Sequence, residues 1–278
     1  HSIVGRGEKL GDLLVQHGVL NSEQASQVLA YQERNGLLFG DSAKRLGLAT
    51  EAELKQALAA QFGFPCVPAG DRTLSRELVA AYHPDSSYAE HLRQLRADLL
   101  SVATPPCVVV AVMSPRHHDG RTHLVGNLAV VFAQSGRRVL VVDADLRRPR
   151  VHDLFKTGNE CGVSVLLSAR KCDKPVREVT HFPGLDVMSA GPKPPNPQEL
   201  ISGEGMLTLL RSARGRYDVV LIDTPPAARY ADGEIVAQMA DTTLIVARKH
   251  KTQHRRLLDL AARLKKKNVA VTGCVLVS

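Results

Sequence analysis

The stretch CVVVAVMSPRHHDGRTHLVGNLAV, residues Cys107–Val130, decides the fold, because it is typical of a buried strand, a turn and a helix. Cys107–Met113 is a continuous apolar run of the length expected for a strand buried on both faces. From Thr122 onward the apolar residues instead follow a helical pattern. We therefore expect a strand that leads through a tight turn into the N-terminus of a helix.

The turn Pro115–Thr122 partly matches the phosphate-loop pattern GxxxxGK[ST]. Gly120 and Thr122 fit the pattern, whereas Pro115 stands at the first Gly and Arg121 at the Lys. Backbone N–H groups at a helix N-terminus, together with the helix dipole, favour a bound anion. The turn therefore predicts a nucleotide site, with candidate binding residues Gly120, Arg121, Thr122, His123 and Asp223.

Three carboxylates follow two further apolar strands. Asp143 and Asp145 come at the end of the expected strand Val139–Asp143 and point to one side, because side chains of an extended segment alternate. Asp223 directly follows the expected strand Asp218–Ile222. Carboxylates at the C-terminal ends of parallel strands suit Mg²⁺ binding and activation of a hydroxyl group. We expect Thr122, Asp143 and Asp223 to hold Mg²⁺, and Asp143, Asp145 and Arg121 to be catalytic.

Strands and helices alternate from residue 107 to the end of the chain. The expected strands are Cys107–Met113, Val139–Asp143, Leu185–Ser189, Asp218–Ile222, Thr242–Ala247 and Val269–Val277, with helices near 122–135, 198–213, 231–240 and 252–267. A further helix is expected within 84–106. The apolar strands favour an α/β fold with a P-loop and a doubly wound, mostly parallel sheet flanked by helices.

An internal repeat precedes this pattern. Lys9–Gln32 and Leu38–Gln61 are units of 24 residues separated by Glu33–Leu37, and each ends in an amphipathic helix. Asn21 or Ser22 is expected to cap the first of these helices and Thr50 the second. Because neither unit can bury a core alone, we expect a small all-helical tandem-repeat domain over 1–65, a linker over 66–83 and the α/β domain over 84–278.

Composition and net charge limit the classes of function that the chain can have. The chain has 278 residues and a formal net charge of +8, which suits either solvated helix faces or an anionic partner such as a nucleotide, a membrane surface or a polysaccharide precursor. Aromatic residues are scarce and Trp is absent, which argues against a nucleic-acid partner. Five cysteines without a CxxC pair indicate reduced thiols in a cytosolic protein. No membrane-spanning run and no signal peptide are visible.

Three motifs resemble, in the same order, those of the bacterial tyrosine autokinases: VVDADLRRPR at Val141–Arg150, AGPKPPNPQELI at Ala190–Ile201 and YDVVLIDTPP at Tyr217–Pro226. Arg248 and Thr252 match a further segment, so the resemblance covers roughly residues 84–278. It implies a cytoplasmic Mg·ATP-dependent enzyme that phosphorylates its own C-terminal tyrosines and regulates polysaccharide polymerisation and export. The chain is most similar to the exosortase-linked chain-length-determinant kinases of exopolysaccharide loci, whose phosphate loop also carries Arg. The resemblance further implies recruitment to the inner membrane by a chain-length-determinant, or polysaccharide co-polymerase, partner.

Glu90, Arg93 and Arg96 are similar to the ExxRxxR motif through which this family assembles into rings. Residues three apart share a helix face, so the three side chains form one charged stripe. A solvated helix face would give the same pattern. The resemblance implies a homo-oligomer that forms through this stripe.

The N-terminal repeat resembles the N-terminal domain of type II secretion and pilus assembly ATPases, in which paired 24-residue motifs bind cyclic di-GMP. Each motif there begins with Arg, for which Lys9 is a partial substitute and Leu38 is none. A protein-docking module is the alternative. The candidate cyclic di-GMP residues are Lys9, Leu10, Gly11, Asp12, Gln32, Leu38, Phe39, Gly40, Asp41 and Gln61.

Two departures from the kinase pattern affect the expected activity. Arg121 and the bulky segment 116–119 occupy a loop in which small residues are expected, and Asp119 adds a negative charge near the phosphate. No tyrosine cluster precedes Ser278. We therefore expect weak Mg·ATP or Mg·ADP binding and slow or absent phosphoryl transfer, in a regulator that senses cyclic di-GMP. The alternatives are an active autokinase and a MinD-like ATPase, for whose additional loop Lys the residue Arg116 is a poor substitute.

Overall fold

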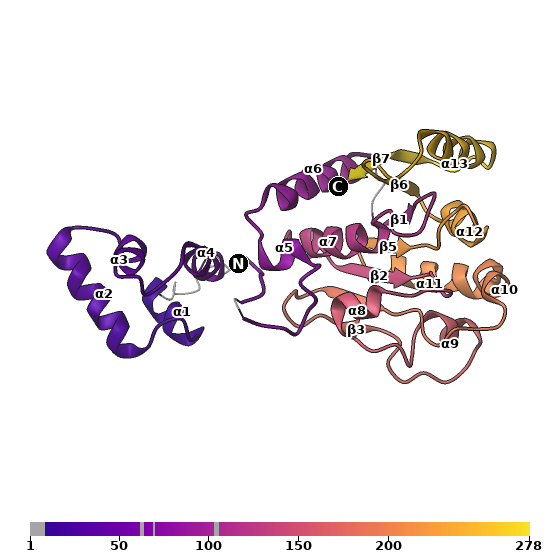
Figure 1. Cartoon of the computed structure of the whole chain (residues 1–278). Coiled ribbons are helices and arrows are strands. Elements are labelled where there is room, and N and C mark those ends of the chain that lie inside the picture. Colours follow the sequence, from indigo (N-terminus) through magenta and orange to yellow (C-terminus); the bar gives the residue numbers. More distant parts are fainter. Residues whose placement is uncertain (1–8, 62–63, 69, 103–105) are drawn as a thin grey trace. The chain divides into compact units, whose positions relative to one another are not determined.

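The computed structural model describes residues 9–61, 64–68, 70–102 and 106–278. The chain divides into two units, of which the first ends at Asp71 and the second begins at Arg72. The smaller unit is helical (Figure 1). Its helices are α1 (Leu10–Gln16), α2 (Ser22–Asn35), α3 (Phe39–Arg45) and α4 (Glu51–Gln61). Helix α1 packs on α4 and α2 on α3, so the two repeat units share one core around Leu14, Val28 and Ala43.

Both helices expected in the repeats begin with side-chain caps. The side chain of Asn21 accepts a hydrogen bond from the Gln24 N–H at 2.8 Å, and the Gln24 side chain accepts from the Asn21 N–H at 2.9 Å. Thr50 and Glu53 make the corresponding contacts at the start of α4. These reciprocal bonds satisfy N–H groups that a helix leaves unpaired at its first turn.

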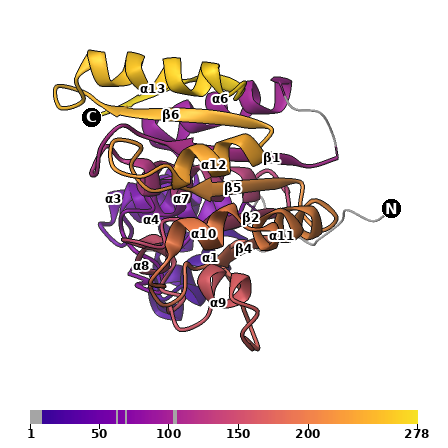
Figure 2. The same ribbon diagram turned by 90° about the vertical axis from the view of Figure 1, so that its right-hand side faces the viewer.

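The larger unit is built on a seven-stranded sheet, counted over the described residues, in the order β3-β4-β2-β5-β1-β6-β7. The strands are β1 (Val108–Met113), β2 (Val139–Asp143), β3 (Arg177–Glu178), β4 (Leu185–Met188), β5 (Val219–Asp223), β6 (Thr242–Arg248) and β7 (Val271–Val277). Figure 2 shows β6, β1, β5, β2 and β4 stacked in this order. All pairs are parallel except β3 with β4, so the expected α/β fold is confirmed.

Helices cover both faces of the sheet (Figure 1). One face carries α5 (Val79–Tyr82), α6 (Ser87–Val102), α7 (Arg121–Ala133) and α8 (Val151–Phe155). The other carries α9 (Val163–Leu167), α10 (Pro197–Ser202), α11 (Glu204–Arg214), α12 (Asp232–Met239) and α13 (His254–Lys266). The central strands are buried on both sides, which explains their unbroken apolar sequences. None of the helices in the described ranges is long and apolar enough to span a membrane.

The segment expected as a linker, 66–83, is not a free connector over its second half. Leu74, Leu78 and Tyr82 are buried, and residues from Arg72 onward belong to the larger unit. The Ala80 N–H donates to Asn127 Oδ1 of α7 at 2.9 Å. The apolar side chains of this segment pack against α7, and this burial anchors it to the α/β unit.

The expectation of five reduced thiols is wrong for two of them. Cys161 and Cys172 form a disulfide with their Cα atoms 5.9 Å apart, whereas Cys66, Cys107 and Cys274 are free. The loop that carries Cys161 is fixed beside the end of β4, where the Val163 N–H donates to the Ser189 carbonyl. Proximity in the fold rather than spacing in the sequence brings the pair together.

Candidate functional site

The phosphate loop connects β1 to α7. Gly120 ends it with φ +94°, in the left-handed region that favours glycine, and a Cβ there would lie 2.9 Å from Val277 Cγ2. The N–H groups of residues 117–123 donate to no other protein group within the described ranges. Unpaired N–H groups at the start of a 13-residue helix form a cradle for an anion.

Asp119 holds the shape of this loop. Its carboxylate is buried, accepts from the Arg116 N–H at 2.8 Å and accepts from the Thr252 hydroxyl at 2.8 Å. The neighbouring residues His118 and Gly120 line the cavity described below, but Asp119 does not. Both oxygens of Asp119 are therefore used within the protein, and the negative charge expected near the phosphate is directed into the loop rather than into the cavity.

Arg121 is buried, with 6% of its surface exposed. Its Nε donates to the Thr224 carbonyl at 2.7 Å, and its Nη1 donates to Ser114 Oγ at 2.5 Å and to the Arg116 carbonyl at 3.1 Å. Two carboxylates lie against the same guanidinium: Asp145 Oδ2 is 3.6 Å from Nη2, and Asp223 Oδ1 is 3.7 Å from Nε. The guanidinium thus binds the loop and lies against the acidic cluster, while Arg121 also lines the cavity described below.

Thr122 and Asp223 lie together, as the sequence predicts. The Thr122 hydroxyl donates to Asp223 Oδ2 at 2.5 Å. Asp223 Oδ1 is buried and accepts no hydrogen bond within the described part of the chain. Burial raises the pKa of Asp223 to about 6, against the lowering effect of Arg121. A buried carboxylate oxygen without a donor, beside a hydroxyl, fits a divalent cation such as Mg²⁺.

Asp143 and Asp145 have different surroundings. Asp143 is fully buried, and its carboxylate accepts from the N–H groups of Asp145, Arg150 and Val151 at 3.1 to 3.2 Å. Burial, followed by the charge of Asp223, raises its pKa well above the usual range. Asp145 lines the cavity, and Asp143 does not. Asp145 is therefore the carboxylate of this pair that reaches the open site, and Asp143 shapes the turn that follows β2.

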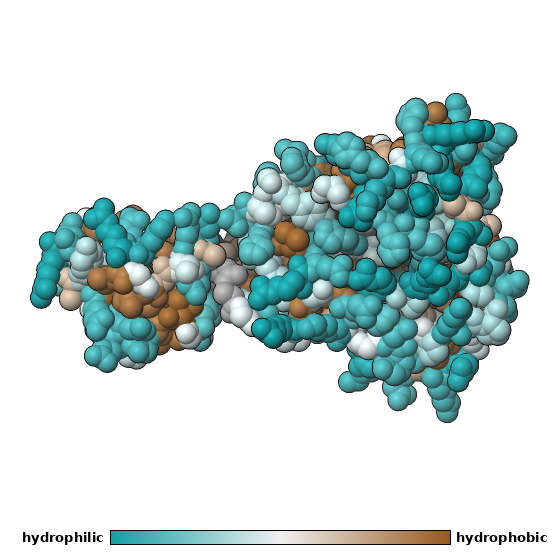
Figure 3. All heavy atoms as spheres, in the orientation of Figure 1, coloured by the Kyte–Doolittle hydropathy of each residue, from teal (hydrophilic) through white to brown (hydrophobic). Residues whose placement is uncertain are grey.

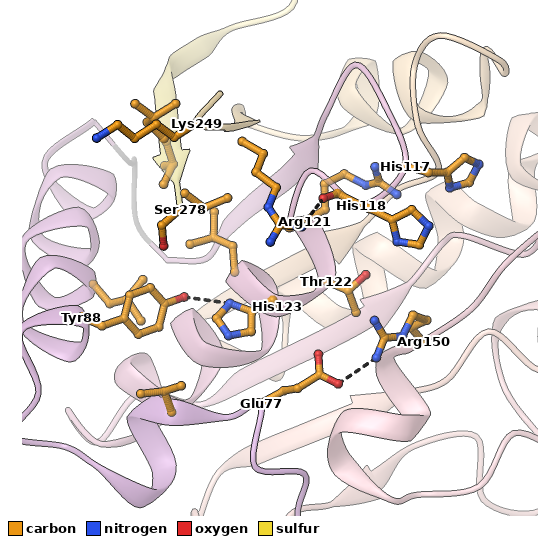
Figure 4. Close-up of a pocket in the computed structure, with 18 of the residues that line it drawn as sticks. Glu77, Tyr88, His117, His118, Arg121, Thr122, His123, Arg150, Lys249 and Ser278 are labelled. Carbon is orange, nitrogen blue, oxygen red and sulfur yellow. Dashed lines mark hydrogen bonds and ion pairs between the residues drawn. The ribbon is translucent and has the colours of Figure 1, made fainter. Parts of the chain in front are cut away.

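A cavity of about 1150 Å³ opens over the phosphate loop. Its walls come from the start of α7, from α6 and from the C-terminal end of β7. Figure 4 shows the Tyr88 hydroxyl directed at the His123 ring, 3.1 Å from Nδ1, and Glu77 paired with Arg150 at 2.8 Å. Burial lowers the pKa of His123 and raises that of Tyr88, which favours the neutral forms of both.

The sequence predicted the loop but not these walls. Tyr88 lies 35 residues before His123, and Ser114, which holds Arg121, carries no motif signal. The same is true of the Thr224 carbonyl, because a backbone acceptor has no sequence signature. Only the fold brings these groups together.

The proposed oligomerisation stripe is partly engaged within the chain. Arg93 donates to Glu90 at 2.6 Å and also to the Pro84 carbonyl, and Arg96 donates to the Val131 carbonyl of α7 at 2.7 Å. Glu90 is exposed, and both arginines are half-buried. Arg96 therefore has a structural role inside one copy of the chain.

Eight of the ten cyclic di-GMP candidates lie at the starts of α1 and α3, whereas Gln32 lies in α2 and Gln61 ends α4. Lys9 and Leu38 stand at the two equivalent N-cap positions, and Leu38 is 74% exposed. A Cβ at Gly11 would lie 3.1 Å from the Phe39 ring, and one at Gly40 would lie 3.7 Å from Leu10, so these residues pack on each other between the repeats. Asp12 and Asp41 are exposed, Gln32 is half-buried, and the side chain of Gln61 lies outside the described part.

Comparison with known proteins shows the family of the chain. A family model described as an AAA domain matches residues 108–269. The tyrosine-protein kinase YwqD of Bacillus subtilis (strain 168) is 35% identical over 181 residues, which are 65% of this chain and 76% of YwqD. The tyrosine-protein kinase etk of Escherichia coli (strain K12) is 34% identical over 208 residues, which are 74% of this chain but only 28% of etk.

Solved structures indicate the same family. The kinase domain of Escherichia coli tyrosine kinase ETK superposes with a TM-score of 0.70 and 33% identity, over 74% of this chain and 81% of that one. The septum site-determining protein MinD of Pyrococcus horikoshii, complexed with Mg-ADP, has a TM-score of 0.52 and 21% identity over 62% of this chain and 70% of that one, which shows a shared fold alone. The chain therefore belongs to the bacterial tyrosine-protein kinase family.

Proposed function

We propose that the α/β unit binds Mg·ATP or Mg·ADP on the phosphate loop and transfers the γ-phosphoryl group slowly or not at all. The observation that carries this proposal is the position of Arg121, whose Nε and Nη1 already donate to protein acceptors. The N–H cradle and the Thr122–Asp223 pair support nucleotide and Mg²⁺ binding. Arg121 must break several contacts before it can stabilise charge on a transferring phosphoryl group.

Phosphoryl transfer depends on positive groups placed at the developing charge. Losing one such contact costs about 2–4 kcal/mol in the transition state, or roughly 10²–10³ in rate. Mg²⁺ at Thr122 and Asp223 would supply part of this charge. Asp145, which faces the cavity, is the carboxylate placed to accept a proton from a hydroxyl.

Replacement of Arg121 by Lys tests the proposal. The lysine side chain lacks the planar fork that reaches Thr224 and Ser114 together, so its ammonium group would be free to approach a phosphate. We expect Arg121→Lys to bind a fluorescent ADP analogue more tightly and to form phosphotyrosine faster. Arg211→Lys is the matched control, because that side chain is exposed on α11 and does not line the cavity. Rapid autophosphorylation by the unmodified chain would instead establish an active autokinase.

The wider role follows from the family and is also a proposal. We propose that the chain regulates exopolysaccharide polymerisation and export from the cytoplasmic side, at the inner membrane, through a chain-length-determinant or co-polymerase partner. The exosortase-linked subgroup, with Arg in its phosphate loop, fits Arg121. Replacement of chromosomal Arg121 by Lys should change the length distribution of the secreted polymer. If the variant binds nucleotide more tightly but leaves the length distribution unchanged, the nucleotide site does not control polymer length.

Assembly through the charged stripe is proposed for Glu90, whose side chain is exposed, together with half-buried Arg93. Glu90→Ala should lower the molar mass measured by light scattering without loss of thermal stability. Arg96→Ala is less informative alone, because it also removes the bond to the Val131 carbonyl. A chain that is monomeric with and without nucleotide would remove this proposal.

Cyclic di-GMP binding by the small unit is a second candidate, favoured by the equivalent exposed positions of Lys9 and Leu38. On the face seen in Figure 3, hydrophobic residues gather at the surface between α2 and α1. Arg can stack on a guanine and also donate to its edge, whereas Lys and Leu cannot. Titration calorimetry should show weak binding that Leu38→Arg strengthens at least tenfold. No heat from either protein at hundreds of micromolar ligand would leave the docking-module alternative.

A further inference from the structure

Of the described lysine and arginine residues, Arg121 alone is buried. It lies within a cluster of three buried carboxylates, Asp143, Asp145 and Asp223. Its two ends approach different carboxylates: Nη2 lies 3.6 Å from Asp145, and Nε lies 3.7 Å from Asp223. One positive group thus bridges two strands at the place where the candidate Mg²⁺ ligands meet.

The contacts with the carboxylates are longer than the hydrogen bonds to the loop. At 3.6 and 3.7 Å they are charge contacts, whereas the Thr224 carbonyl and Ser114 Oγ accept at 2.7 and 2.5 Å. Asp223 Oδ1 consequently has a positive neighbour but no hydrogen-bond donor within the described residues. The loop holds the guanidinium in place, and the acidic cluster gains a compensating charge without being fully coordinated.

We infer that the Arg121 guanidinium and a divalent cation are alternative occupants of the space between Asp145 and Asp223. A guanidinium and a divalent cation repel each other strongly at such short range in a buried site, so the binding of one weakens the binding of the other. In the nucleotide-free chain Arg121 therefore suppresses divalent-ion binding. The phosphates of an arriving nucleotide supply negative acceptors that draw the guanidinium away and admit the metal. This inference rests on the proposed nucleotide site but concerns the order in which Arg121, the nucleotide and the divalent cation occupy it.

Metal binding without nucleotide tests the inference directly. Mn²⁺ is the probe, and the free ion is followed by electron paramagnetic resonance during titration of the nucleotide-free chain. We expect little binding by the unmodified chain, and binding at least about tenfold tighter by Arg121→Gln, which removes the competing charge. Adding Asp223→Asn to that variant should abolish the gain. Arg116→Gln, an exposed charge removed from the same loop, should change the affinity by less than about twofold.

Thermal melting with and without Mn²⁺ gives a second readout, which remains usable if the variant is less stable than the unmodified chain. Mn²⁺ should raise the melting temperature of folded Arg121→Gln but not of the unmodified chain. If the Gln variant does not fold, Arg121→Met replaces it, and the same gain in Mn²⁺ affinity is then expected because this change also removes the competing charge. Equal Mn²⁺ affinity in the unmodified chain and the folded variant would overturn the inference. A separate Mg·ADP titration of the unmodified chain distinguishes this failure from failure of the nucleotide site itself.

Discussion

Neutralisation of Asp119 separates two opposite expectations about the phosphate loop. If its charge opposed the phosphate, Asp119→Asn would strengthen nucleotide binding. The structure instead has both carboxylate oxygens accepting hydrogen bonds, from the Arg116 N–H and from the Thr252 hydroxyl, at 2.8 Å each. Asn retains one carbonyl oxygen and replaces the other with an NH₂ group, so at least one of these bonds is lost. We therefore expect weaker nucleotide binding.

The magnitude follows from the same contacts. A hydrogen bond to a charged group contributes about 1.5–3 kcal/mol to stability. A buried group that loses its partner costs the full desolvation penalty. Because the loop must keep its shape to present the N–H cradle, we expect the free energy of unfolding to fall by roughly 2 kcal/mol and the Kd for Mg·ADP to rise roughly tenfold. Fluorescence titration with an ADP analogue and chemical denaturation measure the two quantities.

Thr252→Val is the matched control for Asp119→Asn. It removes the hydroxyl that donates to Asp119 while leaving the charge of the loop unchanged. If this contact holds the loop, Asp119→Asn and Thr252→Val should both weaken nucleotide binding. Tighter nucleotide binding by Asp119→Asn, with no effect of Thr252→Val, would show that charge rather than loop geometry decides affinity and would refute this reasoning.

Three further predictions concern the surroundings of the site. Burial raises the folded-state pKa of Asp223 to about 6, above its ordinary 3.8, so the stability that its protonated form contributes is lost as pH rises from about 4 to 6. The free energy of unfolding of the unmodified chain should therefore fall relative to that of Asp223→Asn over this range, and a constant difference would contradict the shift. Arg147 holds the buried Asp232 through two hydrogen bonds, at 2.8 and 3.2 Å, so Arg147→Ala should destabilise the chain by about 3–5 kcal/mol in urea titrations, far more than an exposed Arg→Ala change. Non-reducing peptide mapping should recover Cys161 joined to Cys172, and reduction should lower stability by about 3 kcal/mol for a loop of this length; a thiol titration that counts five free cysteines in the unreduced native chain would contradict the pairing.

Much of the fold could be predicted because long apolar runs and helical periodicity are strong signals. Strand Val139–Asp143 has the expected bounds, since a parallel strand buried on both faces must be apolar throughout. Short elements gave no such signal: β3 has two exposed residues, and α8 and α9 have five residues each. The single helix expected near 198–213 is two helices separated at Gly203, where the backbone is extended.

The candidate site was predictable in its residues but not in its contacts. Thr122 and Asp223 were expected to meet because a phosphate loop and a strand-end carboxylate share one edge of the sheet, and their side chains are 2.5 Å apart. The partners of Arg121 were not predictable, since Ser114 is 7 residues away and Thr224 is 103 residues away. Which way a long charged side chain turns depends on packing, and composition does not specify it.

The measurement that tests the proposed function most directly combines binding and transfer in one experiment. The unmodified chain is mixed with Mg²⁺, radiolabelled ATP and a tyrosine-containing polymer, and both bound nucleotide and phosphotyrosine are followed over time. The proposed function predicts saturable nucleotide binding together with phosphotyrosine formation that is absent or roughly 10²–10³-fold slower than the 1–100 s⁻¹ of ordinary kinases. A rate within that ordinary range, or no nucleotide binding at millimolar ATP, would contradict it.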